Sequence, residues 1–269
     1  MKLYCDITLP ASKSESNRVL MIAAYGGFAP VFQNLSDSKD TKVLKEALRS
    51  LPFIDSSLPT ALCRNDIKGS QQIIDIADCG TAARFLTTYL ACHSGDWLLM
   101  GTERMQQRPM SPLVDALRSL GSDIQYVENE GCLPLRIKGK PISGGKISVD
   151  MTQSSQFASS LLLAAPMFPQ GLELELLGEL NSLPYLDMTI NMMCHFSAQV
   201  ERRGRTVVVK PHPYQPRPFS VESDWSAASY WYEMAAFSED CEIRLHGLAG
   251  FRQAQELQSC KAMPLSLNG

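Results

Sequence analysis

The stretch Pro10-Ala11-Ser12-Lys13-Ser14-Glu15-Ser16-Asn17-Arg18 stands immediately before the apolar run Val19 to Ala24. Serine and asparagine favour helix N-caps, because their side-chain oxygens accept the backbone N–H groups that a first turn leaves unpaired. The amino end of a helix also carries partial positive charge, to which nearby cations add. We therefore predict a buried helix whose start binds an anion through Lys13, Ser14 and Arg18. For one such segment taken alone, an ordinary cap with solvated charges is the alternative.

Recurrence of this pattern favours the functional interpretation. Polar segments beginning at Ser16, Thr81, Ser154 and Ser226 each lead into an apolar helical run, at intervals of roughly 70 residues. This interval is longer than the period of simple solenoid repeats. We expect several polar helix starts to converge on one site.

A second helix recurs in step with the first. The segment from Val43 to Leu51 resembles the segment from Leu113 to Leu120, and Tyr185 to Val200 is a more divergent copy. The sequence therefore predicts three copies of a βα-type unit and part of a fourth.

Composition bounds the class of protein. The 269 residues can bury a full core and hold two domains. An apolar fraction of 45% with 20% charged residues is typical of a soluble globular protein. The net charge of −3 without a long basic run argues against nucleic-acid binding. The apolar runs are too short to span a bilayer, and the first residues do not resemble a signal peptide.

The cysteines and histidines predict neither a disulfide framework nor a metal site. The eight cysteines are scattered without a C-x-x-C pair, and the four histidines lack ligand spacing. A reduced, cytoplasmic protein is the simplest interpretation. We single out Cys79, beside a Gly-Thr turn, as a candidate reactive thiol.

Other catalytic motifs are missing from the sequence. There is no G-x-G-x-x-G fingerprint and no G-x-S-x-G elbow. The segment from Ser143 to Lys146 is interpreted as a hairpin turn rather than a P-loop. What remains is Ser, Thr, Gln, Lys and Arg at helix starts, a set that suits phosphate and carboxylate groups. A charge-assisted hydrogen bond contributes about 1.5–3 kcal/mol, so several on one anion give useful affinity without a metal.

The remaining pattern predicts short strands between these helices. Pro109 suits the first turn of a helix, and Asp224 or Ser226 caps the fourth helical run. The expected strands cover residues 3–9, 31–35, parts of 62–76, 97–100, 123–127, 133–137, 146–149, 172–177, 199–201, 206–210 and 242–245.

Six blocks, in order, resemble the 5-enolpyruvylshikimate-3-phosphate synthase (EPSP synthase) family between about Thr8 and Gly247. They are Pro10 to Arg18, Gly80 to Arg84, Arg104 to Pro109, Ser154 to Phe157, Ser182 to Tyr185 and Asp224 to Tyr230. The sister UDP-N-acetylglucosamine enolpyruvyl transferases share the fold, but lack the Ser-Lys-Ser-x-Ser-Asn-Arg form and the Ser-Ser-Gln block.

The resemblance implies an α/β fold (α+β in some schemes) of repeated βαβαββ units. In the family, two domains of three units enclose the active site. By that layout residues 11–222 form one complete domain, and residues 1–10 and 223–269 form part of the second. The implied reaction transfers the enolpyruvyl group of phosphoenolpyruvate to the 5-hydroxyl of shikimate 3-phosphate, without metal or organic cofactor. These two small molecules are the implied partners, and the full-length form is expected to be a monomer.

The resemblance also assigns site residues. Lys13 would sit near both substrates and assist proton transfer. The residues implied for shikimate 3-phosphate are Lys13, Ser14, Arg18, Ser154, Ser155, Gln156, Ser182 and Tyr185. Those implied for phosphoenolpyruvate are Lys13, Gly80, Thr81, Arg108 and Gln156.

Two departures from the family pattern stand out. Asp78 and Cys79 replace small or amide residues, and Asp78 would add negative charge beside an anion site. The family's chains are also much longer, and their second half supplies an Asp general base, a Lys, a Glu and several Arg. We therefore expect a C-terminally truncated form that binds shikimate 3-phosphate weakly and turns over negligibly alone, with apolar surface exposed on Ser226 to Phe237. A binding-only protein for a phosphorylated metabolite, a structural repeat protein and the sister enzyme are the alternatives.

Overall fold

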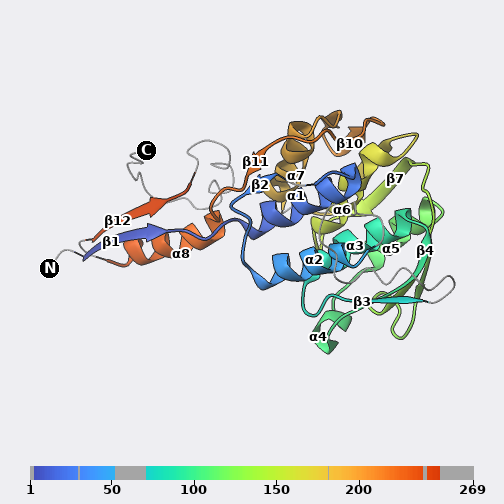
Figure 1. Ribbon diagram of the computed structural model, residues 1–269, viewed down its shortest axis with the longest axis horizontal. Helices are drawn as coiled ribbons and strands as arrows, with labels where there is room; N and C mark the ends of the chain where they lie inside the picture. Colours follow the sequence, from blue (N-terminus) through green and yellow to red (C-terminus); the bar gives the residue numbers. More distant parts are fainter. Residues whose placement is uncertain (1–2, 30, 52–70, 181, 239–240, 249–269) are drawn as a thin grey trace.

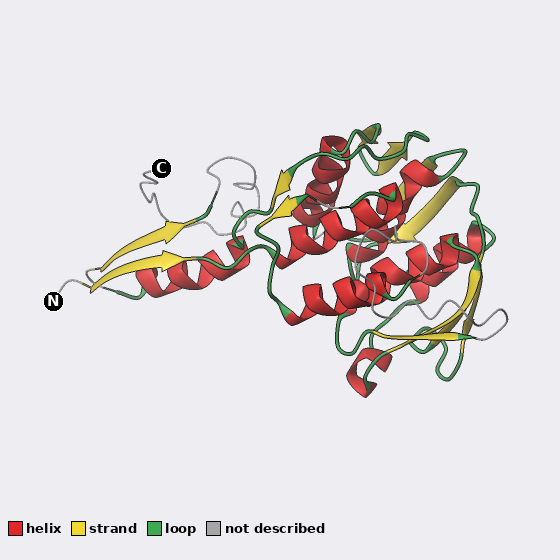
Figure 2. Ribbon diagram, in the orientation of Figure 1, coloured by secondary structure: helices red, strands yellow, loops and turns green. Residues whose placement is uncertain are grey.

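The computed structural model describes residues 3–29, 31–51, 71–180, 182–238 and 241–248 (Figures 1 and 2). The predicted segment 62–70 lies outside this part of the chain. The described helices are α1 (Lys13–Gly26), α2 (Lys39–Arg49), α3 (Gly80–Cys92), α4 (Glu103–Gln106), α5 (Ser111–Ser119), α6 (Gln156–Ala164), the 3-10 turn η1 (Ala165–Met167), α7 (Leu183–His195) and α8 (Trp225–Ala236). The strands are β1 (Leu3–Thr8), β2 (Phe32–Gln33), β3 (Gln72–Asp75), β4 (Gly95–Met100), β5 (Asp123–Tyr126), β6 (Leu135–Gly139), β7 (Gly145–Asp150), β8 (Leu172–Leu177), β9 (Val200–Arg203), β10 (Thr206–Val209), β11 (Phe219–Ser220) and β12 (Cys241–His246).

Two stretches of chain fold with the same topology. In the second unit, from β3 to β6, the strand order is β3-β4-β6-β5; in the third unit, from β7 to β10, it is β7-β8-β10-β9. In both, the first two strands pair in parallel across a helix, and the later pairs are antiparallel. Each stretch is therefore a βαβαββ unit, which confirms the repeated α/β fold predicted from the sequence.

The first unit is assembled from distant parts of the chain. It contains α1, β2 and α2, and β2 pairs in parallel with β11, so that Phe32 lies opposite Phe219. The three units together form the body of the molecule.

Apolar helices fill the centre of the body. Helices α1, α3 and α6 pack against one another, and all but one residue of α3 is buried. Phe85, Leu86 and Phe157 are at most 1% exposed. A helix that is apolar on every face must be enclosed in this way, whereas α2 and α5 bury one face only.

A small outlying unit extends from one end of the body (Figure 1). It consists of the parallel pair β1 and β12 with α8 packed beside it. Its core is a small cluster around Leu9, Trp225 and Ala228. Met234 is 55% exposed and Phe237 is 84% exposed, which confirms the predicted apolar surface on this helix. The division of the chain into two domains remains a prediction.

Two local predictions are wrong. The helix after the 101–109 loop begins at Ser111 and places Pro112 in its first turn; the carbonyl of Pro109 instead accepts a hydrogen bond from Arg84. The segment from Ser143 to Lys146 is not a hairpin turn, because β6 and β7 belong to different sheets. Tertiary contacts decide both features, since the local residues are compatible with either arrangement. None of the described helices has the length and apolar character needed to cross a membrane.

Candidate functional site

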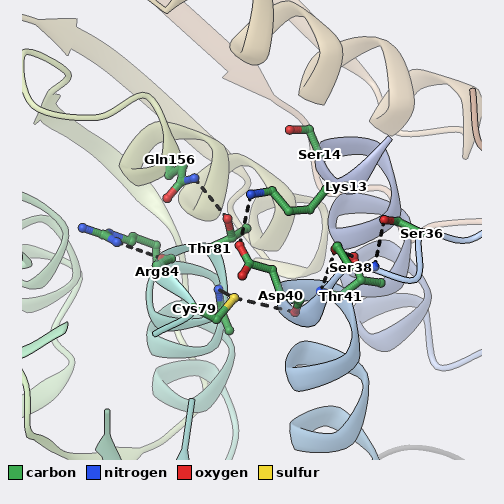
Figure 3. A network of polar contacts seen from close by, with 12 residues as sticks. Lys13, Ser14, Ser36, Ser38, Asp40, Thr41, Cys79, Thr81, Arg84 and Gln156 are labelled. Atoms are coloured by element: carbon green, nitrogen blue, oxygen red, sulfur yellow. Dashed lines mark hydrogen bonds and ion pairs between the residues drawn. The ribbon is translucent and has the colours of Figure 1, made fainter. Parts of the chain in front are cut away.

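The candidate site lies where the amino ends of α1, α2, α3 and α6 meet (Figure 3). The predicted helix start is capped by Ser12, whose hydroxyl accepts from the backbone N–H of Glu15 at 3.3 Å. Directly after the cap, Lys13 extends its amine to the carboxylate of Asp40, with Nζ and Oδ2 3.2 Å apart. Both side chains are partly exposed, so an incoming anion can reach this amine.

A hydrogen-bond chain joins the starts of α3 and α6. The amide Nε2 of Gln156 donates to the hydroxyl of Thr81 at 3.1 Å, and the backbone N–H of Gln156 donates to the hydroxyl of Ser154 at 3.2 Å. In Figure 3, Lys13 and Gln156 extend toward Thr81 from opposite sides. Three predicted contacts from three separate units therefore gather in one place.

Two guanidinium groups crowd the first turn of α3. A Cβ atom on Gly80 would lie 2.4 Å from Nη1 of Arg108 and 2.5 Å from Nη1 of Arg84, so glycine permits this close approach. Arg84 is buried, and donates to the carbonyls of Gly80 at 2.9 Å and Pro109 at 3.2 Å. Burial, and then the charge of Arg108, lower the pKa of Arg84 to about 10. No carboxylate of the described residues forms an ion pair with either group, so a bound anion would relieve their repulsion.

Arg18 has a structural role that the sequence did not reveal. Its side chain is 3% exposed and donates to the hydroxyl of Thr189 at 2.7 Å, the carbonyl of Ser14 at 2.9 Å and the carbonyl of Tyr185 at 3.3 Å. These contacts tie α1 to α7. Direct contact of Arg18 with a ligand stays a prediction, whereas its positioning of Ser14 and Tyr185 is visible in the structure.

The hydroxyl-bearing residues predicted for the sugar phosphate lie at the starts of α6 and α7. Ser154, Ser182 and Tyr185 are partly exposed, whereas Ser155 is buried at 5% exposure. Through Arg18, the start of α7 adjoins Ser14. Two groups of predicted residues are therefore linked: Ser14 and Tyr185 through Arg18, and Thr81, Gln156 and Ser154 through direct hydrogen bonds.

The two residues that depart from the family pattern behave differently. Cys79 is 2% exposed and caps α3, its sulfur accepting from the N–H of Ala82 at 3.3 Å. Burial raises the pKa of this thiol to about 11, so the prediction of a reactive cysteine is wrong. Asp78 accepts from the hydroxyl of Thr102 at 2.6 Å and pairs with Lys39 at 3.2 Å, and these partners lower its pKa. Lys39 therefore offsets the negative charge expected to weaken the anion site.

Sequence reasoning missed two participants. Asp40 lies in the first turn of α2, but its pairing with Lys13 joins residues from different helices. Arg84 belongs to the quoted Gly-Thr-x-x-Arg block, yet only the structure places its guanidinium beside that of Arg108. Within the described ranges, no cluster of three or more His, Cys, Asp or Glu residues could hold a metal ion.

Comparison with known proteins identifies first the fold of this chain and then its family. The chain superimposes on the structure of EPSP synthase from Acinetobacter baumannii with a TM-score of 0.73 at 20% identity, covering 93% of this chain and 56% of that one. The two chains therefore share a fold. The model of the family EPSP synthase (3-phosphoshikimate 1-carboxyvinyltransferase) matches residues 1–260, and the chain belongs to this family.

Curated relatives agree with the family. A 3-phosphoshikimate 1-carboxyvinyltransferase of Bacteroides fragilis is 45% identical over 248 residues, which cover 92% of this chain and 56% of the relative. One from Photobacterium damsela subsp. piscicida is 37% identical over 254 residues, which cover 90% of this chain and 59% of the relative. The chain thus spans little more than half the length of these relatives.

Proposed function

We propose that this chain provides the shikimate 3-phosphate-binding half of a 3-phosphoshikimate 1-carboxyvinyltransferase. In that reaction the 5-hydroxyl of shikimate 3-phosphate adds to C2 of phosphoenolpyruvate while C3 gains a proton. Loss of phosphate and of a proton from C3 of the tetrahedral intermediate then gives the enolpyruvyl ether. The observation that carries the proposal is the gathering of Lys13, Thr81, Gln156 and two guanidinium groups at packed helix starts.

The geometry suggests that different residues of the site bind the two substrates. The hydroxyls of Ser14, Ser154 and Ser182 and the side chains of Gln156 and Tyr185 suit the phosphate and ring hydroxyls of shikimate 3-phosphate. Fixed donors of this kind position a substrate without reorganising during the reaction.

The cationic side of the site suits phosphoenolpyruvate. Arg108 and Arg84 flank Gly80 at a helix start, where backbone N–H groups and the helix dipole already favour phosphate. Lys13 would donate or accept a proton at the reacting atoms. The family resemblance puts the Asp general base and further arginines outside these 269 residues. We therefore expect binding without turnover from this chain alone.

Calorimetry tests the proposal. Shikimate 3-phosphate should bind with 1:1 stoichiometry and should be preferred over shikimate and over glucose 6-phosphate. Lys13→Met should weaken binding at least 10-fold, whereas Lys42→Met, on exposed α2 surface, should not. Equal affinity for the panel of sugar phosphates would favour the binding-only alternative, and no binding by the intact chain would refute the assignment.

Finer points belong to the same proposal. The outlying unit fits a domain division at residues 11–222. The net charge of −3 fits a monomeric full-length form, and the scattered cysteines fit a cytoplasmic location. The match to the EPSP synthase family weighs against a UDP-N-acetylglucosamine enolpyruvyl transferase.

A further inference from the structure

The variable position of the Ser-Lys-Ser-x-Ser-Asn-Arg signature holds a glutamate in this chain. Glu15 lies in the first turn of α1, between two serines and two residues after Lys13. Its side chain is buried, with the residue 5% exposed. A buried carboxylate is unfavourable unless hydrogen bonds compensate its lost hydration, so the contacts of Glu15 need an explanation.

Those contacts reach a distant segment of the chain. Oε2 of Glu15 accepts from the backbone N–H of Glu222 at 2.9 Å, across 207 positions in sequence. The carbonyl of Glu222 in turn accepts from the backbone N–H of Ser12 at 2.7 Å. The hydroxyl of Ser12 accepts from the N–H of Glu15. These three bonds form a closed ring between the start of α1 and residue 222.

Residue 222 lies at the crossing between the body and the outlying unit. Asp224 donates its N–H to the carbonyl of Pro10 at 2.8 Å, and Ser223 donates its N–H to the carbonyl of Gly247 at 3.2 Å. Gly247 has φ +92°, and a Cβ there would lie 2.1 Å from the hydroxyl of Ser223. The segment that follows β1, the segment that precedes α8 and the segment that follows β12 therefore meet at one tightly packed point.

The negative charge of Glu15 disfavours a direct role in binding an anionic ligand. A carboxylate in a first turn is favoured by the helix dipole, but beside an anion site it opposes the charge of the ligand. Its hydrogen bond from the N–H of Glu222 instead directs it toward the crossing segment.

We propose that Glu15 is a positioning residue that ties the crossing of residues 9–12 and 222–224 to the helix start bearing Lys13 and Ser14. Displacement of the outlying unit is thereby transmitted to the candidate site, and ligand at the site stabilises the crossing. The ligand part of this inference rests on the proposed function; the anchoring part does not.

Hydrogen exchange of single backbone amides, followed by NMR on the intact chain, tests the anchoring directly. Without ligand, Glu15→Leu should speed exchange of the Glu222 amide at least 10-fold. Glu15→Gln retains a carbonyl acceptor of the same length and should change it less than 3-fold. The matched control Glu46→Gln, on the exposed face of α2, should leave this amide unchanged. If Glu15→Leu leaves the exchange of the Glu222 amide as in the wild type, the proposal is overturned.

Ligand measurements then test the coupling. Shikimate 3-phosphate should slow exchange of the Glu222 and Asp224 amides at least 3-fold in the wild type, and less than 1.5-fold in Glu15→Leu at matched saturation, because coupling between sites is reciprocal. If the wild type is saturated with shikimate 3-phosphate and hydrogen exchange of both amides is unchanged, the coupling is refuted. If the wild type does not bind shikimate 3-phosphate, the proposed function fails, and the ligand-free comparison alone decides whether Glu15 is the anchor.

Discussion

The second and third units share one strand order but bring different chemistry to the site. At the start of α3 the second unit contributes the guanidinium groups of Arg84 and Arg108. At the starts of α6 and α7 the third unit contributes hydroxyls and an amide, among them Ser154 and Gln156. One unit thus supplies a cationic half-site and the other a neutral, hydrogen-bonding half-site.

This difference shows that only a few residues of each unit determine the chemistry that the unit brings to the site. Apolar residues facing the core determine the sheets and central helices, and they are similar in kind in both units. The polar residues at the helix starts and in the loop after the second strand lie next to that core rather than among its apolar residues, so they can differ between units that share one strand order. Duplication of one fold therefore leaves room for a site with unlike halves.

The largest expected contrast between the units concerns their cysteines. Cys79 in the second unit is buried with its pKa raised to about 11, whereas Cys194 in the third unit is exposed. Burial also raises the pKa of Cys194, so its exposure to the reagent carries part of the contrast. Because only the thiolate reacts, iodoacetamide at pH 8 should modify Cys194 at least ~10-fold faster than Cys79. Peptide mapping by mass spectrometry gives the two rates, and denatured protein, in which both react alike, is the control. Equal rates in the native protein would contradict the buried cap at α3.

The next contrast is between cationic and neutral contacts. Arg108→Gln should raise the Kd for inorganic phosphate about 10- to 100-fold, the range of one charge-assisted hydrogen bond, and should reduce its dependence on salt. Arg104→Gln, in the neighbouring helix α4 and also exposed, is the matched control. NMR titration at two salt concentrations measures both effects. A similar loss in both variants would indicate general surface charge rather than a site at Gly80.

Removing a neutral contact should have a smaller effect. Gln156→Ala deletes the amide that bonds Thr81 and should weaken shikimate 3-phosphate binding about 2- to 10-fold, the range of a neutral hydrogen bond. Its salt dependence should be unchanged. Gln125→Ala, exposed on β5, serves as the control in calorimetry. A loss larger than that of Arg108→Gln, measured with the same ligand, would reverse the order of importance of the two half-sites.

The smallest expected effect distinguishes the carboxyl ends of α3 and α6, which lie opposite the helix starts at the candidate site. His93, at the end of α3, stacks on Tyr89, and burial lowers its pKa; α6 ends at Ala164 without a titratable group. The unfolded chain binds a proton at higher pH than the native chain, so the contribution of His93 should lower stability as pH falls from about 7 to 5.

Urea unfolding at several pH values measures this slope. His93→Phe preserves an aromatic ring and should flatten the slope, whereas His212→Phe, in the proline-rich segment, should not flatten it in the same way. An unchanged slope in His93→Phe would assign the pH dependence to other groups.

Much of the local structure was predictable. A serine of the predicted helix start caps α1, Asp224 caps α8 as one of the two expected residues, and the strands expected at 199–201 and 206–210 form the antiparallel pair β9 and β10. These features depend on residues within one or two turns of each other, so the sequence pattern is sufficient. The first turn of α5 was misplaced, because Pro109 and Pro112 carry the same local signal.

Contacts between distant residues were not predictable in the same way. The pairing of Lys13 with Asp40 joins two helices, and the burial of Arg18 depends on Thr189 in a third. Arg18 and Arg108 both appear in the sequence as cations near helix starts, yet one is enclosed by protein acceptors and the other is exposed. Only packing separates these two environments.

The sequence by itself determined the repeated unit, the helix starts, the family and the kinds of side chain at the site, because each of these is written in short-range patterns of apolar and polar residues. The tertiary structure decided which of those side chains meet, which are enclosed and how Glu15 reaches Glu222. Such contacts depend on how helices and sheets far apart in the chain pack together, and packing is a property of the whole core rather than of any one segment.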